Sequence, residues 1–138
     1  MRRSRQVGIF IVVVASIGPT CGPTFRCGND SVATFASPNA EMKAVVFRRS
    51  CGATTGFSTE VSILQFRDAA PNDNAGGNVF AVGDTLGPGR VEPDEEVLKV
   101  SVEWLSPQVA RITYDERADV YRQELARDGV RLTYRTRR

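Results

Sequence analysis

The 138-residue chain contains no histidine, and its only lysines are Lys43 and Lys99. Without histidine there is no Ser-His or Cys-His pair to activate a nucleophile, and no imidazole to bind a metal ion. A Ser–Lys dyad would need one of the two lysines, and neither has a recognisable spacing to a serine. The composition therefore argues against an enzyme, and we predict no catalytic, cofactor-binding or metal-binding residue.

The chain also lacks an apolar run of the roughly 20 residues that a membrane-spanning helix needs. Its longest candidate, residues 8–17, is shorter and follows Arg2, Arg3 and Arg5. A basic start before a short apolar core is typical of a secretory signal peptide. We therefore interpret residues 1–20 as a signal peptide and predict an exported protein, located in the periplasm or cell envelope, or secreted.

Cysteines are few and odd in number: Cys21, Cys27 and Cys51. Cys21 follows the apolar core where a degraded lipobox would place it, so it is a candidate for lipidation and membrane attachment. Lipidation would leave Cys27 and Cys51 to form a disulfide, which persists outside the cytoplasm. Without lipidation, Cys21 could be free, pair with Cys27 or compete for Cys51. We predict the Cys27–Cys51 pairing.

Positive charge is concentrated at the two ends of the chain. Without residues 1–20 the chain would have 15 basic and 16 acidic residues, a net charge of −1, so we predict no nucleic-acid partner. From Arg111 onward there are eight arginines against five acidic residues. This bias suits an anionic partner such as lipid headgroups or an envelope polymer. An exposed strand face followed by a frayed tail would explain it equally well.

The remaining pattern is one of short strands separated by turn residues. We interpret residues 21–39 as a flexible N-terminal segment and residues 40–138 as a single β domain. The fold predicted is mainly β: a single antiparallel meander or small sandwich of five to seven strands, with long loops and at most one short helix. The expected strands are 42–49, 60–66, 79–82, 97–105, 110–114 and 130–134.

Residues 115–128 fit two structures. Asp115 could cap a helix that ends at Gly129, whereas Asp128-Gly129 between two strand-like runs favours a hairpin, which we prefer. For the core we expect the large apolar and aromatic residues of the expected strands. These are Phe47, Ile63, Leu64, Phe66, Val100, Val102, Trp104, Ile112 and Tyr114.

A Gly/Thr/Ser-rich patch, CGATTGFST, lies between the first two expected strands, at residues 51–59. It is only superficially similar to a phosphate-binding P-loop, because Phe57 stands where that loop has lysine and no helix pattern follows. We interpret the patch as a tight connection held by a disulfide. A ligand-binding loop is the alternative, and it would use Thr54, Thr55, Phe57, Ser58 and Thr59.

Acidic residues gather in two of the expected loops: Asp68, Asp73, Asp84, Glu92, Asp94, Glu95 and Glu96. Their spacing matches no calcium-binding loop. Two carboxylates that converge in a pocket are enough for glycoside hydrolysis. A small carboxylate-dependent hydrolase is therefore the enzymatic alternative for this chain.

The motifs SP at 37–38, KAVVF at 43–47, CGATTGFST at 51–59 and VSIL at 61–64 resemble a group of short, exported, uncharacterised bacterial proteins. The likeness extends over residues 37–114, and its specific part is the cysteine-containing block. Asn39-Ala40 departs from the Asp-Gly that the group tends to have. The resemblance implies an exported, lipoprotein-like or secreted domain of unknown function, and it supplies no catalytic residue.

Together, these features predict a non-enzymatic exported or envelope-anchored β domain that binds a protein or an envelope component. Besides the hydrolase, the alternative is an enzyme inhibitor or immunity-type protein. The sequence identifies no particular partner and no oligomeric state.

Overall fold

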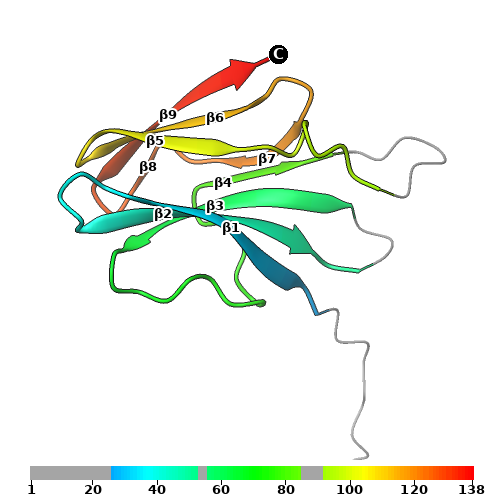
Figure 1. Ribbon diagram of the computed structural model, residues 1–138, viewed down its shortest axis with the longest axis horizontal. Helices are drawn as coiled ribbons and strands as arrows, with labels where there is room; N and C mark the ends of the chain where they lie inside the picture. Colours follow the sequence, from blue (N-terminus) through cyan, green and yellow to red (C-terminus); the bar gives the residue numbers. More distant parts are fainter. Residues whose placement is uncertain (1–25, 53–55, 85–91) are drawn as a thin grey trace, which may run out of the picture.

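The computed structural model describes residues 26–52, 56–84 and 92–138, which form two β-sheets packed face to face (Figure 1). Every regular element in these ranges is a strand, and none of the described residues forms a helix with the length and hydropathy to cross a membrane. The predicted mainly β small sandwich is confirmed. The expected signal peptide and Cys21 lie outside the described residues.

The first sheet, sheet A, has five strands, and every neighbouring pair is antiparallel. In spatial order they are β1 (Gly28–Ala36), β2 (Met42–Ser50), β3 (Phe57–Gln65), β4 (Phe80–Gly83) and β7 (Asp119–Gln123). β1 occupies part of the segment that the sequence predicted to be flexible, so that prediction is wrong for residues 28–36. β1 was missed because it is an edge strand whose side chains are mostly exposed, which leaves little apolar pattern to detect.

The second sheet, sheet B, consists of β5 (Ser101–Ser106), β6 (Val109–Asp115), β9 (Val130–Arg137) and β8 (Ala126–Arg127), in that spatial order. β6 and β9 are parallel, which a simple meander does not contain. The described residues thus form nine strands, more than the five to seven predicted. β5 also begins later than the predicted strand 97–105, because residues 95–98 form turns.

The expected hairpin before the last strand is present. β8 and β9 are joined by Asp128 and Gly129, whose φ angles of 48° and 80° are both positive, as a tight type I′ turn requires. No helix forms over residues 115–128. Asp115 instead accepts a hydrogen bond from the backbone N–H of Arg117 at 2.9 Å, and this turn leads the chain from β6 to β7.

The core between the sheets is formed by the inward-facing residues of both sheets. It includes Ala44, Val46, Val61, Ile63, Phe80, Val82, Val102, Ala110, Ile112, Val130 and Leu132. Of the predicted core residues, Trp104 and Tyr114 are half-buried and pack against this cluster. The prediction for Phe66 is wrong: its side chain is 49% exposed, because β3 ends at Gln65 and the next residue starts a loop.

Phe47 is buried on the other side of sheet A, away from sheet B. Together with Val45 it faces the outer side of β2, and each is only 1% exposed. The loop of residues 66–79 lies across this side, beneath sheet A in Figure 1. Its backbone accepts hydrogen bonds from Lys43 and, at 3.2 Å, from Arg49. β2 is therefore covered on both faces, which explains why its sequence is apolar on both.

Candidate functional site: the outer face of sheet B

The outer face of sheet B is built by strand alternation. In the parallel ladder, Arg111 lies beside Thr133 and Thr113 lies beside Arg135. The residues between them point inward, so that Ile112, for example, is fully buried. The alternating pattern of β6 and β9 thus places arginines and threonines together on one surface.

Strand β5 extends this surface by one more row of polar side chains. Ser101 lies beside Thr113, and Glu103 lies beside Arg111. The Oε2 atom of Glu103 is 3.6 Å from Nη1 of Arg111, and both side chains are well exposed, so this pair adds little to stability. We call the set formed by Ser101, Arg111, Thr113, Arg131, Thr133 and Arg135 the basic face.

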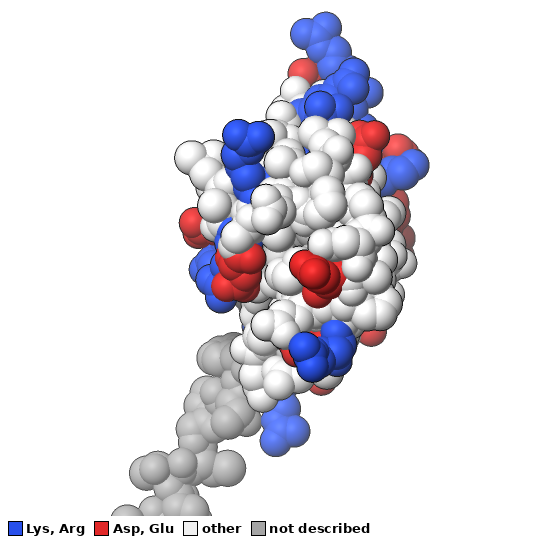
Figure 2. Space-filling model, turned by 90° about the vertical axis from the view of Figure 1, so that its left-hand side faces the viewer, with Lys and Arg blue, Asp and Glu red and all other residues white. Residues whose placement is uncertain are grey.

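Within the described part of the chain, Arg131 and Arg135 have no acidic partner, and both are exposed. Figure 2 views one end of the sandwich and shows Lys and Arg side chains, with a few acidic ones among them, at the top of the molecule, on the side of sheet B. A loop reaches this side of sheet B at one end, where the guanidinium of Arg137 donates to the carbonyls of Glu96 and Lys99. Among the described residues no such bond reaches the side chain of Arg131 or Arg135, so this part of the basic face is open to a partner.

One end of sheet B holds a buried carboxylate. Asp115 is 1% exposed and receives two parallel hydrogen bonds of 2.9 Å from the guanidinium of Arg117. Nη1 of Arg137 is 3.9 Å from its Oδ2 atom. The hydrogen bonds from Arg117 lower the pKa of Asp115 to about 2, so it is ionised at neutral pH. This acid joins the ends of β6 and β9 and has a structural role.

Residues 92–96 also hold their acidic side chains against arginines. Glu95 receives two hydrogen bonds from Arg48, at 3.0 and 2.8 Å, and these bonds lower its pKa. Glu96 lies 3.7 Å from Arg137. Both glutamates line a hollow of about 260 Å³ with apolar walls that include Leu98 and Val100. A general acid needs a raised pKa, so Glu95 does not fit the general-acid role in the hydrolase alternative.

Three other acidic residues of the predicted loops, Asp68, Asp73 and Asp84, lie elsewhere. Asp84 is 8% exposed and accepts a hydrogen bond of 2.6 Å from the backbone N–H of Asp94. Asp73 accepts one from the backbone N–H of Asn29, and Asp68 is exposed. The described residues contain no group of three or more acidic or cysteine side chains arranged to hold a metal ion.

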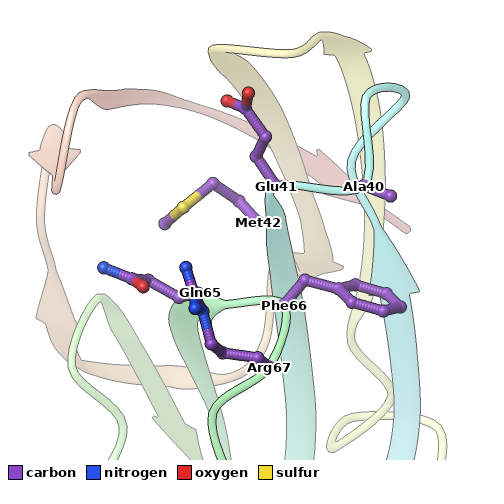
Figure 3. Close-up of a pocket in the computed structure, with 6 residues that line it drawn as sticks. All are labelled: Ala40, Glu41, Met42, Gln65, Phe66 and Arg67. Carbon is purple, nitrogen blue, oxygen red and sulfur yellow. The ribbon is translucent and has the colours of Figure 1, made fainter.

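A wider pocket of about 470 Å³ lies where β2 begins and β3 ends, and it is lined by Ala40, Glu41, Met42, Gln65, Phe66 and Arg67. Figure 3 shows Met42, Gln65 and Arg67 pointing toward a common space, while the ring of Phe66 points away from it. Its polar side chains are all exposed. The pocket thus lacks the enclosed polar groups that fix a ligand's orientation, and we assign it no function.

The residues predicted as a binding loop are mostly part of a strand. Phe57, Ser58 and Thr59 begin β3, and Thr54 and Thr55 lie outside the described residues. Thr59 is 2% exposed and its hydroxyl donates to the carbonyl of Leu98 at 2.6 Å. Ser58 donates to Glu60. Their hydroxyl groups are therefore engaged within the protein.

The predicted disulfide between Cys27 and Cys51 is present, with the Cα atoms 3.9 Å apart. It joins the residue before β1 to the residue after β2, directly beside the register pair Gly28–Ser50. The bond thus closes the open end of the β1–β2 pair and secures the edge strand to the sheet.

Sequence reasoning identified the arginine-rich C-terminal region but not the surface that it forms. The signal was the alternation of arginine with apolar residues in 109–115 and 130–137. What could not be seen was that these two segments lie side by side in parallel, which brings Arg111 between Arg131 and Arg135.

Comparison with known proteins adds no identity: no family model, no curated protein and no solved structure matches this chain. The resemblance to short exported bacterial proteins stays a prediction, and the functional conclusion depends on the geometry above.

Proposed function

We propose that the protein is an exported, non-enzymatic β-sandwich that binds an acidic partner protein in the cell envelope through the basic face. The observation that carries this proposal is the uncovered surface with Arg111, Arg131 and Arg135. Complementary charge guides partners to each other and disfavours wrong ones. The chemistry of this surface therefore selects a partner with carboxylates.

The charge on this face is a local property. The chain without residues 1–20 would carry a net charge of −1, so its overall charge does not attract anions. Among the described acidic residues, Asp115 and Glu96 are engaged by Arg117 and Arg137 at the end of the sheet. Arg131 and Arg135 have no acidic partner among the described residues, so their guanidinium groups can attract an acidic surface.

The composition of the face favours a protein over a membrane. Threonine and serine hydroxyls lie between the arginines at positions set by the strands, about 5 Å apart, and they can form specific hydrogen bonds. A surface that enters a bilayer needs a large apolar area beside its cations. The basic face has mainly polar side chains instead.

Export is supported by the Cys27–Cys51 disulfide, because such bonds persist in oxidising compartments. The predicted signal peptide and candidate lipidation of Cys21 point the same way. Cell fractionation followed by intact mass measurement, with and without reductant, tests this part of the proposal. A full-length chain in the cytosol with all three thiols reduced would contradict it.

The binding proposal is tested by charge reversal with a labelled acidic polypeptide, poly-L-glutamate, as the probe. For the variant Arg131→Glu/Arg135→Glu we expect affinity at low salt to fall by about tenfold or more. The control Arg26→Glu/Arg67→Glu makes the same change in net charge at exposed sites outside the basic face. We expect it to change affinity by less than about threefold.

Equal losses in the two variants would show that only net charge matters, and would overturn the assignment of the face. Vesicles of phosphatidylglycerol and phosphatidylcholine form a second arm of the experiment. Binding to these vesicles without binding to poly-L-glutamate would replace the acidic protein with a lipid surface.

A further inference from the structure

The chain changes from one sheet to the other within two neighbouring residues. The N–H of Glu124 donates to the carbonyl of Val79, at the start of β4, with a distance of 2.8 Å. The next residue, Leu125, accepts a hydrogen bond of 2.9 Å from Leu132 of β9. β7 therefore belongs to sheet A, and only the short β8 accompanies β9 in sheet B.

This change leaves part of the outer edge of β9 without a neighbour. β8 pairs only with Val130 and Arg131, and the Leu125–Leu132 bond ends the contact. β9 continues as a strand to Arg137. Within the described ranges no strand pairs with residues 133–137 on that side.

Strand alternation shows which backbone groups this edge presents. The N–H of Arg131 donates to the carbonyl of Gln108, just before β6, and the carbonyl of Arg137 accepts from the N–H of Glu116, just after it. Odd-numbered residues of β9 therefore direct their backbone groups toward β6. Even-numbered residues face the other way, because backbone groups alternate along a strand in a ladder. Tyr134 and Thr136 thus direct their N–H and carbonyl groups to the free edge.

The other edges of the sandwich are interrupted. β1, β5 and β7 each contain a bulge with respect to their neighbour. The extra residues are Val32, Leu105 and Tyr121, and their side chains are 60%, 44% and 65% exposed. Bulges at edges hinder pairing with further strands. β9 has no such bulge in its register with β6 or β8, so its edge remains regular.

We propose that the acidic partner binds by adding an extended segment, antiparallel, as a strand at the free edge of β9. This inference rests on the proposed function and specifies its mode. A strand at this edge would continue the ladder that β8 begins, pairing with the backbone of Tyr134 and Thr136. Its outward side chains would lie beside Arg135, about 5 Å away across the strands.

The arrangement also specifies the sequence pattern of the partner. Side chains of an added strand alternate between the two faces of the sheet. Acidic residues on the outward side would meet Arg135 and, diagonally, its neighbours on the basic face. The inward side chains would lie beside Tyr134, whose ring packs against Phe80 with centroids 5.3 Å apart. The partner segment therefore alternates acidic and apolar residues.

The experiment uses the folded chain and two labelled peptides of equal charge. One alternates glutamate with valine, and the other alternates glutamate with proline, which has no N–H to donate and cannot form a ladder. We expect the valine peptide to bind about tenfold more tightly than the proline peptide. We also expect the amides of Tyr134 and Thr136, but not those of Thr133 and Arg135, to gain protection from hydrogen exchange.

A variant of the edge itself provides the second measurement. Thr136→Pro removes an N–H that points to the free edge of β9 and leaves the hydrogen bonds to β6 intact. Proline is tolerated at such edge positions. We expect this variant to bind the valine peptide about tenfold more weakly. Thr136→Val keeps the N–H and should bind as the parent chain does. Circular dichroism and thermal unfolding confirm that both variants are folded.

The possible outcomes separate the two proposals. If both peptides bind equally and Thr136→Pro has no effect, strand addition is overturned. The proposed function survives that result as long as Arg131→Glu/Arg135→Glu still weakens binding of poly-L-glutamate. If neither peptide nor poly-L-glutamate binds, the proposed function itself fails, and strand addition fails with it.

Discussion

The two outer faces of the sandwich have opposite environments, although both belong to twisted sheets of similar size. The outer face of sheet A is covered by the protein's own loop of residues 66–79, and it buries Val45 and Phe47 almost completely. The outer face of sheet B is covered only at the end that holds Asp115 and Arg137, within the described residues, and it leaves Arg131 and Arg135 exposed. One sheet is therefore apolar on both sides, and the other has a single apolar side.

A buried carboxylate on each sheet differs in the same way. Glu60, on sheet A, is 9% exposed and accepts hydrogen bonds from neutral donors, the hydroxyl of Ser58 and the N–H of Gly77. Asp115, on sheet B, is held by the charged Arg117. Sheet A uses its acid to hold the covering loop, and sheet B uses its acid to hold two strand ends. We infer that the first face serves stability and the second is left for binding.

The strongest test of this difference is truncation of Phe47. Because its ring is buried beneath the covering loop, Phe47→Ala should destabilise the protein by about 3–5 kcal/mol in urea unfolding. Thr133→Ala on the basic face is the control, and its effect should stay within about 0.5 kcal/mol. Similar losses at the two positions would show that the faces do not differ as described.

Removal of the disulfide should affect sheet A more than sheet B. Cys27→Ser/Cys51→Ser releases the end of β1 and should lower the free energy of unfolding by about 2–4 kcal/mol. Native-state hydrogen exchange should become faster in β1 and remain unchanged in β6 and β9. Uniformly faster exchange in both sheets would mean that the bond stabilises the whole fold rather than one edge.

The close approach of the loop to sheet A can be tested at Gly77. A Cβ atom there would lie 2.7 Å from the carbonyl oxygen of Phe80 and 2.9 Å from Cβ of Glu60. Gly77→Ala should therefore cost about 1–3 kcal/mol in thermal or urea unfolding, because backbone must move to accept the methyl group. At Gly28 the same addition meets nothing within 4 Å, and Gly28→Ala should have little effect. If Gly77→Ala left the free energy of unfolding unchanged, the loop of residues 66–79 could not lie as close to sheet A as described.

The smallest expected effect is the response of sheet B to acid. Asp115 has a folded pKa of about 2, below its ordinary value of 3.8. Its contribution to stability is therefore complete above about pH 4 and disappears as the pH falls through 2. Asp115→Asn should unfold with less pH dependence between pH 4 and 2 than the parent chain. Since Arg117 is 57% exposed, added salt should weaken the effect, and an unchanged pH profile in the variant would refute it.

Local sequence patterns predicted much of the fold. The apolar run of β2, the alternation in β6 and β9, and the Asp128-Gly129 turn appear where they were expected, and β5 only begins later than predicted. These features depend on neighbouring residues, whose backbone preferences and side-chain alternation are visible in the sequence. β1 was missed because it lies at the edge of a sheet, and Phe66 was placed in the core although β3 ends just before it. Where a sheet or a strand ends is a tertiary property.

The candidate site shows the same limit. The arginines after residue 110 were recognised, but Arg111, Arg131 and Arg135 form one surface only because β6 and β9 pair in parallel. The predicted loop at Phe57, Ser58 and Thr59 was instead drawn into β3, where Thr59 bonds to Leu98. The partner of each hydroxyl is far away in the sequence, so no local pattern could reveal it.

By itself, the sequence determined that this protein is built from strands and where most of those strands lie. Because it has no histidine, it also excluded Ser-His and Cys-His catalysis and metal binding through imidazole. The tertiary structure alone decided which outer face is covered and that, among the described residues, β9 has a free edge. The physical reason is the separation along the sequence of the residues that interact. Alternation and turns are determined by residues a few positions apart, whereas covering a face or leaving an edge open depends on pairing between distant segments.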